Sequence, residues 1–163
     1  MPEHAQWRIV EIGGQIRQAV DRIIREEWGG PVVVSRGRAL DTSTHRGFAW
    51  VEDEKVMGLI TYDVIGEACE ITVLTSLAEG RGIGTALIRA TKERAHALGC
   101  KRLWLVTTND NAHAIRFYQR QGFILAAAHI GAMEAARALK PSIPLTGMDG
   151  IPLRDELEFE MWM

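Results

Sequence analysis

The sequence predicts a mixed α/β fold in a single domain, and three observations lead to this fold class. Runs with the two-residue alternation of strands are interspersed with runs whose apolar residues recur at helical spacing. A chain of 163 residues has the size of one domain and can bury a core without metals or disulfides. The sequence contains no internal repeat, low-complexity tract or interdomain linker. We therefore expect one domain over residues 1–163.

In the first half of the chain, turn-forming residues separate the periodic runs. The sequence Gly29-Gly30-Pro31 ends a helical pattern, and the charged turn at 53–55 joins two alternating runs as in a hairpin. Residues 31–46 are irregular, so a surface loop and a wall of a substrate site are both open, and His45 receives no role. The elements expected here are a strand at 6–12, a helix at 16–28, strands at 47–52 and 56–64, and a strand at 68–74.

The second half of the chain alternates helices with strands. Asn109 or Asp110 is expected to cap the helix that starts near residue 111, and residues 142–154 form a long loop. The run at 102–107 has the continuous apolar character of a strand buried on both faces. The other elements expected are a helix at 82–98 with Leu87, Ile88, Thr91, Ala95 and Leu98 inward, a strand at 123–128, a helix at 132–140, and a half-buried final strand in which Leu157, Phe159 and Met161 alternate with Glu156, Glu158 and Glu160.

Charge and cysteine content limit the classes of partner. A formal net charge of −2 provides no basic field for nucleic acid or for an anionic membrane, so neither partner is expected. Cys69 and Cys100 lie far apart, have no metal-ligand spacing, and are typical of reduced thiols in a cytosolic protein. No apolar run reaches membrane-spanning length, and residues 1–8 lack the apolar region of a signal peptide. We expect a cytoplasmic protein without a metal cofactor.

A glycine-rich segment at 79–85, Glu-Gly-Arg-Gly-Ile-Gly-Thr, leads into the helix expected at 82–98. Glycine at every second position lets consecutive backbone N–H groups converge on an anion, and the helix adds its positive N-terminus. The dinucleotide fingerprint is excluded because Leu87 stands where it needs Gly or Ala, and the P-loop is excluded because Thr85 has no lysine beside it. A phosphate or pyrophosphate remains the expected ligand, and a purely structural turn is the alternative.

A second motif lies at 111–123, Asn-Ala-His-Ala-Ile-Arg-Phe-Tyr-Gln-Arg-Gln-Gly-Phe. Spacings of three and four residues place Asn111, Ala114 and Tyr118 on one face of a helix. The small alanine allows a ligand to lie against that face, and the asparagine amide can form a hydrogen bond to it. Taken alone, this pattern equally describes a helix whose aromatic residues are buried in the core.

Together the two motifs resemble those of the GNAT family of acetyl-CoA-dependent N-acetyltransferases. The first is similar to Gln/Arg-x-x-Gly-x-Gly/Ala, with Glu79 departing from the pattern, and the second to Asn-x-x-Ala-x-x-(Leu/Phe)-Tyr-x-x-x-Gly-Phe. The resemblance covers residues 47–128 most clearly. It implies a mixed, mostly antiparallel sheet flanked by helices, and a strand before the glycine loop that splays away from the next strand so that pantetheine pairs with its edge. The cofactor-binding residues it implies are Thr72, Val73, Leu74, Glu79, Gly80, Arg81, Gly82, Ile83, Gly84, Thr85, Asn111, Ala114 and Tyr118.

The resemblance also implies the chemistry: direct attack of a primary amine on the acetyl thioester. Tyr118 corresponds to the general acid that protonates the departing thiolate. Glu70, four residues before Leu74 and therefore expected on the same strand face, is the candidate general base, with Glu67 able to act through water. An exposed strand carboxylate is the alternative for Glu70. An acetyl-cysteine intermediate is disfavoured because no His or acidic residue is adjacent to either cysteine in a family-specific way.

The acceptor remains open at this stage. A small amine or amino acid derivative, a lysine side chain and a protein N-terminus all fit, and a homodimer is also left open. The rival function is a non-catalytic acyl-CoA-binding module of the same fold. Tyr118 and Asn111 favour the enzyme, whereas Glu79 and the missing glutamate at the end of the strand at 102–107 favour the rival.

Overall fold

The computed structural model describes residues 5–163. Nine strands and four α-helices make up the described chain, with two short 3-10 turns labelled η1 and η2. In chain order they are β1 (Trp7–Glu11), α1 (Gly14–Trp28), β2 (Val32–Ser35), β3 (Arg38–Asp41), η1 (Thr42–Thr44), β4 (Arg46–Glu52), β5 (Lys55–Ile65), β6 (Ala68–Ser76), α2 (Ile83–Ala97), β7 (Arg102–Thr108), α3 (Ala112–Arg120), β8 (Ile124–His129), α4 (Ala132–Leu139), η2 (Met148–Gly150) and β9 (Glu156–Trp162).

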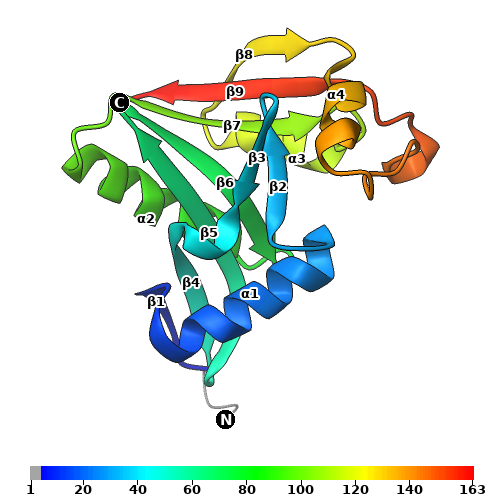
Figure 1. The fold of residues 1–163 in the computed structure, drawn as a ribbon. Helices are drawn as coiled ribbons and strands as arrows, with labels where there is room; N and C mark the ends of the chain where they lie inside the picture. Colours follow the sequence, from blue (N-terminus) through cyan, green and yellow to red (C-terminus); the bar gives the residue numbers. More distant parts are fainter. Residues whose placement is uncertain (1–4) are drawn as a thin grey trace.

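Seven of the strands form one twisted sheet in the order β1-β4-β5-β6-β7-β9-β8, and β2 pairs with β3 in a separate hairpin (Figure 1). Among the described strands, β6 and β7 are the one parallel pair, and the other neighbours are antiparallel. The structure therefore confirms the mixed, mostly antiparallel α/β fold. The parallel pair is connected through α2, as a crossover between parallel strands requires.

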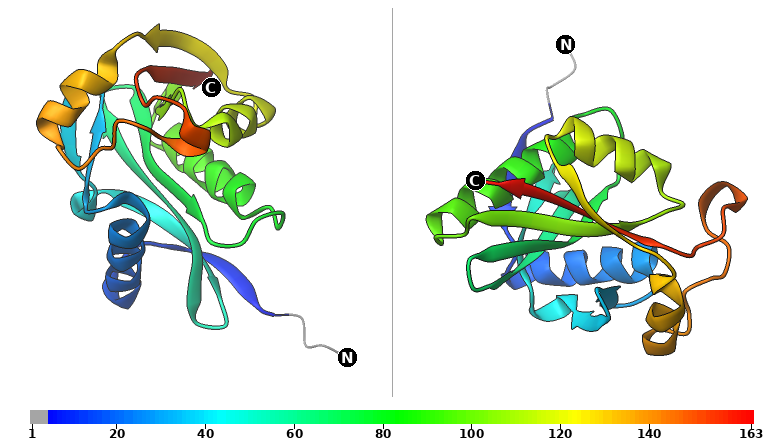
Figure 2. Two further views of the ribbon diagram at one scale, coloured as in Figure 1. Left: turned by 90° about the vertical axis from the view of Figure 1, so that its right-hand side faces the viewer. Right: turned by 90° about the horizontal axis from the view of Figure 1, so that it is seen from above.

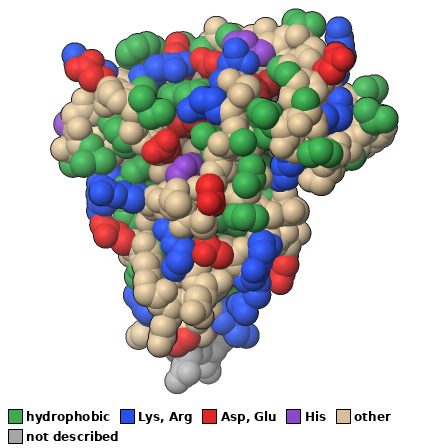
Figure 3. All heavy atoms as spheres, in the orientation of Figure 1, with side chains coloured by type: hydrophobic (Ala, Val, Ile, Leu, Met, Phe, Trp, Pro, Cys, Tyr) green, Lys and Arg blue, Asp and Glu red, His purple; other side chains and the backbone are tan. Residues whose placement is uncertain are grey.

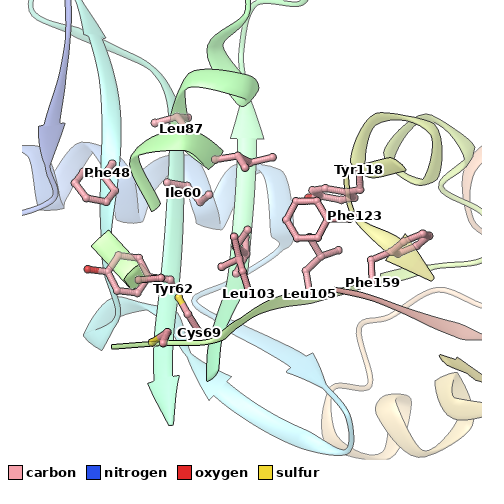
Figure 4. Packing of buried hydrophobic residues seen from close by; sticks show 14 of the residues in the cluster. Phe48, Ile60, Tyr62, Cys69, Leu87, Leu103, Leu105, Tyr118, Phe123 and Phe159 are labelled. Atoms are coloured by element: carbon pink, nitrogen blue, oxygen red, sulfur yellow. The ribbon is translucent and has the colours of Figure 1, made fainter. Parts of the chain in front are cut away.

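Helices cover both faces of the sheet. Seen from above, α2 and α3 lie on one side, and α1 lies on the other with the β2–β3 hairpin and α4 (Figure 2). The core on the side of α2 and α3 contains Phe48, Ile60, Tyr62, Leu87 and Phe159 and reaches Tyr118 (Figure 4). A second core forms where α1 packs on strands β4–β6.

The irregular segment 31–46 contains a hairpin that the sequence analysis missed. Its strands β2 and β3 pair from Val32 with Asp41 to Ser35 with Arg38. The two-residue turn between them has positive φ at both positions, 50° at Arg36 and 74° at Gly37, as a tight hairpin turn requires. Arginine is not a usual residue for this conformation, and the strands are four residues long, so the local pattern is weak.

Three smaller expectations about burial are wrong. Leu98 ends α2 in an exposed position instead of facing the core. In β7, Trp104 and Val106 are half-buried, so this strand is not buried on both faces. The glutamates of β9 are more buried than an outward row would be, because Arg36 and Arg102 form ion pairs with Glu156, Glu158 and Glu160.

Surface charge is mixed: on the face shown in Figure 3, acidic and basic side chains are interspersed with apolar ones. Within residues 5–163, no helix is both long enough and apolar enough to span a bilayer.

Candidate active site

The site is organised by the divergence of β6 and β7. The two strands pair over three residues, from Ala68 with Arg102 to Glu70 with Trp104. Beyond that point β6 stays with β5 while β7 continues along β9, and the two strands separate (Figure 1). Among residues 5–163, no strand pairs with the edge of β6 after Glu70 on the β7 side, which agrees with the splay that the family resemblance implies.

The backbone of Leu74 points its N–H into this opening. The N–H of Leu77 donates to the carbonyl of Met57 on β5 at 2.8 Å, and Leu74 is paired with Ile60 in the same register. Because backbone groups alternate sides along an antiparallel strand, residues 73, 75 and 77 turn toward β5 and Leu74 turns away from it. This free N–H is a hydrogen-bond donor for a carbonyl oxygen lying between the strands.

A β-bulge at Thr72 corrects one expectation about the site. The pairing of β5 with β6 slips by one residue between Thr61 with Val73 and Tyr62 with Ile71, so Thr72 is the extra residue. The slip reverses the alternation of side chains. Leu74 packs on the side of α2, whereas Glu70 reaches the β2–β3 hairpin on the side of α1. Glu70 and Leu74 therefore lie on opposite faces, contrary to the sequence analysis.

The glycine segment joins the open edge of β6 to the first turn of α2. Gly80 and Gly82 have φ of 72° and 76°, where a side chain would be strained, and Gly82 caps the helix without any side-chain hydrogen bond. The helical ladder starts with the N–H of Ala86 donating to Gly82 at 3.0 Å. Among residues 5–163 no group accepts a hydrogen bond from the N–H of residues 83–85, so three donors and the helix dipole are available to an anion.

Gly84 has a different reason to be glycine. A Cβ at this position would lie 3.0 Å from the Phe117 ring of α3. The absence of a side chain there lets α2 and α3 pack closely, and Gln121 strengthens this contact by donating to Thr85 at 3.0 Å. Of the three glycines in the segment, Gly80 and Gly82 therefore leave open space and Gly84 serves packing.

The charged residues of the segment differ in their surroundings. Arg81 forms an ion pair with Glu52 at the end of β4, at 2.8 Å, and this hydrogen bond lowers the pKa of Glu52. Glu79 is exposed, and it forms no ion pair within the described part of the chain. Arg81 is therefore paired with the Glu52 carboxylate, and Arg81 does not compensate the negative charge of Glu79.

This arrangement predicts the effect of Glu79→Gln on acetyl-CoA binding. Removing an exposed negative charge beside a multiply negative ligand should tighten binding by about three- to tenfold at low salt, because the two charges repel through partly screened solvent. Calorimetric titration at two ionic strengths measures this, and the gain should shrink as salt rises. Glu134→Gln, on an exposed position of α4, makes the same charge change away from the loop and should have little effect. Weaker binding by Glu79→Gln would contradict the prediction and show that the carboxylate is a needed structural partner.

Asn111 performs a task that the sequence analysis expected of its neighbours. Its Oδ1 accepts from the N–H of Ala114 at 3.1 Å and caps α3, so neither Asn109 nor Asp110 is the cap. The Nδ2 group of Asn111 stays available for a ligand, as no hydrogen bond within residues 5–163 uses it. Ala114, one turn along the helix, is half-buried against the core on the side of α2.

Asn109 and Asp110 instead hold the long segment that follows α4. Asn109 accepts from the backbone N–H of Arg154 and Asp155, at 3.0 and 2.9 Å. Asp110 is buried and accepts from the N–H of Met148 at 2.9 Å. The segment at 145–155 is thereby fixed beside the N-terminus of α3.

Tyr118 is buried on α3, with 9% of its surface exposed. Its ring makes edge-to-face contacts with the rings of Phe117 and Phe123, at centroid distances of 5.4 and 5.8 Å. Figure 4 shows the Tyr118 ring beside that of Phe123. Burial raises the pKa of this phenol, so it stays protonated throughout the neutral range. The hydroxyl forms no hydrogen bond to any residue of 5–163, and its proton is therefore not committed to a protein acceptor.

Glu70 is buried, with 3% of its surface exposed, and both of its oxygens have partners. Ser35 donates to Oε2 at 2.5 Å, and Arg38 forms an ion pair with Oε1 at 2.6 Å. The carboxylate thus connects β6 to the β2–β3 hairpin and is not the exposed strand residue of the alternative interpretation. Both carboxylate oxygens are therefore occupied by partners from the hairpin.

A polar group that the sequence analysis missed lies beside the bulge. Thr72 Oγ1 is 2.7 Å from Thr61 Oγ1 and 2.9 Å from His45 Nδ1. His45 is buried and follows η1. No local pattern could have linked these residues, because the contact depends on the bulge and on how η1 leads into β4.

The cysteines are unsuited to an acyl-enzyme. Cys69 and Cys100 are free and buried in the core beside α2. Burial raises the pKa of the Cys69 thiol to about 12, so a reactive thiolate is not formed at neutral pH.

Comparison with known proteins identifies the family to which this site geometry belongs. The sequence model of the acetyltransferase (GNAT) family matches residues 16–123. The Bacillus subtilis protein YdhI is 43% identical over 135 residues, which cover 82% of this chain and 84% of that protein. An IAA acetyltransferase from Bacillus cereus has a TM-score of 0.75 and 18% identity, covering 97% of this chain and 100% of its own. A Bacillus subtilis acetyltransferase in complex with CoA has a TM-score of 0.70 and 17% identity, covering 97% and 99%.

Proposed function

The chain belongs to the acetyltransferase (GNAT) family, and we propose that it transfers the acetyl group of acetyl-CoA to a primary amine by direct attack. The observation that carries the proposal is the open edge of β6, with the free N–H of Leu74, leading into the uncapped N-terminus of α2. The thioester carbonyl of acetyl-CoA needs one hydrogen-bond donor, and its pantetheine arm needs an open strand edge. Its pyrophosphate needs a cluster of backbone N–H donors.

Each part of the site has a role in this reaction. The N–H groups of residues 83–85 receive the pyrophosphate, and Gly80 and Gly82 let it approach the backbone. The N–H of Leu74 stabilises the oxyanion that forms when the amine attacks the thioester. Tyr118 then gives its proton to the departing sulfur. Asn111 and Ala114 present a smooth helix face beside the path of the pantetheine.

The acceptor is a primary amine whose larger structure is not specified by these features. We place its entry on the side of the sheet that carries α1 and the β2–β3 hairpin, opposite the side on which α2 and α3 lie. We propose that the reaction takes place in the cytoplasm, where acetyl-CoA and reduced thiols coexist.

Release of CoA thiol tests the proposal. The purified protein is mixed with acetyl-CoA and a panel of acceptors: polyamines, amino acids and their amides, lysine peptides and peptides with free N-termini. Free thiol should appear with at least one acceptor, and mass spectrometry should find the acetylated amine. Acetyl-CoA without acceptor is the control for hydrolysis.

The rival function, an acyl-CoA-binding module, predicts a different pair of results. Such a module would show saturable binding of acetyl-CoA with no thiol release for any acceptor in the panel. Turnover with one acceptor rejects the rival, whereas tight binding with no turnover across the panel contradicts the proposed enzyme.

A further inference from the structure

A chain of three polar side chains runs from inside the sheet to the bulge of β6. Thr61 on β5, Thr72 on β6 and His45 after η1 are joined through Thr72 Oγ1, which is 2.7 Å from Thr61 Oγ1 and 2.9 Å from His45 Nδ1. A hydroxyl has one donor and two acceptor positions. If Thr72 donates to His45 and accepts from Thr61, one acceptor position of Thr72 is left for a third group.

The chain lies on the face of the sheet that carries α1, the side on which the proposed function places the acceptor. Thr61 alternates along β5 with Ile60 and Tyr62, which pack on the side of α2, so its hydroxyl faces the side of α1. Thr72 shares that face through its contact with Thr61. It also lies two residues before Leu74, whose N–H points into the opening between β6 and β7. The Thr72 hydroxyl is therefore two residues along β6 from the N–H group that the proposed function assigns to the thioester carbonyl.

His45 is fixed in place by contacts that leave its ring free to accept a proton. Its carbonyl accepts from Arg17 of α1 at 2.5 Å, and its N–H donates to the carbonyl of Thr42 at 3.1 Å. The Nδ1 atom makes the contact with Thr72, and among residues 5–163 the Nε2 atom has no hydrogen-bond partner. In the described part of the chain, the side-chain atoms that are fully buried and lack a partner are Arg17 Nη1 and Tyr62 Oη. Nε2 of His45 is not one of them, so it keeps contact with solvent and can exchange a proton with water.

The charges around His45 come from four elements. Asp63 of β5, Glu70 of β6 and Asp41 of β3 raise its pKa, and Arg17 of α1 lowers it. Burial is the largest effect, and the net result is a pKa below the ordinary value of 6.5. The imidazole is neutral at pH 7 and able to accept a proton. Glu70, in contrast, has both oxygens occupied by Ser35 and Arg38.

We propose that His45 is the final acceptor of the proton lost by the amine, and that Thr72 relays it. This inference rests on the proposed acetyl transfer. An alkyl ammonium gives a proton to Thr72 Oγ1 while the hydroxyl proton of Thr72 passes to His45 Nδ1, and the imidazolium then releases a proton to water through Nε2. Before the next turnover Nε2 takes a proton from water and Nδ1 returns its proton through Thr72 to solvent in the emptied site, which restores the starting tautomer. The neutral amine forms its bond to the thioester carbon, the carbon–sulfur bond breaks, and Tyr118 protonates the sulfur. The second proton of the nitrogen leaves as the amide forms and restores Tyr118 through solvent.

The test compares pH–rate profiles of His45→Asn, Thr72→Val and the wild type. Asparagine can keep a hydrogen bond to Thr72 but does not titrate, and valine keeps the shape of threonine without its hydroxyl. Each variant should lower kcat/KM for an alkyl amine about 100-fold or more, since proton removal by a placed group contributes at least that much. His45→Asn should also remove the fall in rate below pH 6.5 that protonation of His45 causes in the wild type. With hydroxylamine as the acceptor, which is neutral at pH 7 and has no proton to give up before attack, kcat/KM of both variants should fall much less.

Three controls separate the outcomes. His96→Asn, at an exposed position of α2, should leave the profile unchanged. Stabilisation by acetyl-CoA should persist in both relay variants, which shows that they fold and retain the cofactor site. In the wild type, NMR titration of the His45 ring should give the pKa of the acidic limb, a result that needs no variant at all.

Failure of this inference differs from failure of the proposed function. If no amine is acetylated by the wild type, the proposed function is wrong. If the wild type turns over and His45→Asn keeps its rate and its acidic limb, or if the NMR pKa of His45 differs from that limb, the relay is wrong. If Glu70→Gln loses the acidic limb of the pH–rate profile while His45→Asn keeps it, proton removal is assigned to Glu70.

Discussion

Tyr118→Phe is expected to lower turnover of acetyl-CoA with its amine by about 100- to 10,000-fold, the usual contribution of a general acid. The ring is held between Phe117 and Phe123, so phenylalanine should pack in the same way and remove only the hydroxyl. Since burial raises the pKa of this phenol, the wild-type group is protonated over the whole assay range and should produce no limb in the pH–rate profile near neutrality. Steady-state kinetics and calorimetric titration check the prediction together: kcat falls while the Kd for acetyl-CoA changes little.

Tyr62→Phe is a matched control for this loss. Tyr62 is also a buried tyrosine, with 3% of its surface exposed, and its hydroxyl has no partner in residues 5–163. It lies at the other end of the core from Tyr118 (Figure 4). Tyr62→Phe should leave kcat unchanged. Equal rates for Tyr118→Phe and the wild type would reduce Tyr118 to a packing residue.

Gly82→Val is expected to abolish the stabilisation that acetyl-CoA gives the wild type. A ligand that binds only the native state at a hundredfold excess over Kd adds about 2.7 kcal/mol, which for a domain of this size raises Tm by roughly 5–10 °C. Valine at a φ of 76° is strained, and its side chain would occupy the open space beside the N-terminus of α2. Melting curves with and without millimolar acetyl-CoA measure the effect.

Gly66→Val controls for the strain. Gly66 has a φ of 61° in the exposed turn between β5 and β6, and a Cβ added there would meet no atom within 4 Å. The variant should melt lower than the wild type without ligand and still gain several degrees from acetyl-CoA. If Gly82→Val also keeps that gain, the glycine segment is not the pyrophosphate site.

Sequence reasoning found the parts of the site that are local in the chain. The glycine segment and the motif on α3 are each encoded within about a dozen consecutive residues, because a helix N-terminus and a helix face depend on near neighbours. Outside the β2–β3 hairpin, the order of strands and helices could be predicted for the same reason. The correct elements around the site, α2 and α3 with β6 and β7, all came from periodicity and turn residues.

The parts that sequence reasoning missed depend on partners far along the chain. The bulge at Thr72 exists only relative to β5, and the one-residue slip moved Glu70 to the face opposite Leu74. The partners of Glu70, Ser35 and Arg38, come from a hairpin whose short strands carry little signal. His45 likewise reaches Thr72 across 27 residues. Such contacts require the register of the sheet, and periodicity does not provide it.

The backbone N–H groups of Leu74 and residues 83–85 give the most direct test of the account. In a two-dimensional NMR titration of the wild type, acetyl-CoA should shift these resonances most and slow their exchange with water, since each is a free donor that the ligand would engage. The N–H of Thr75, which faces β5, should change less. Strong changes at Leu74 and at 83–85 together would support an acetyl-CoA site between β6 and β7. Changes confined to the exposed face of α1, with none at these four N–H groups, would contradict it.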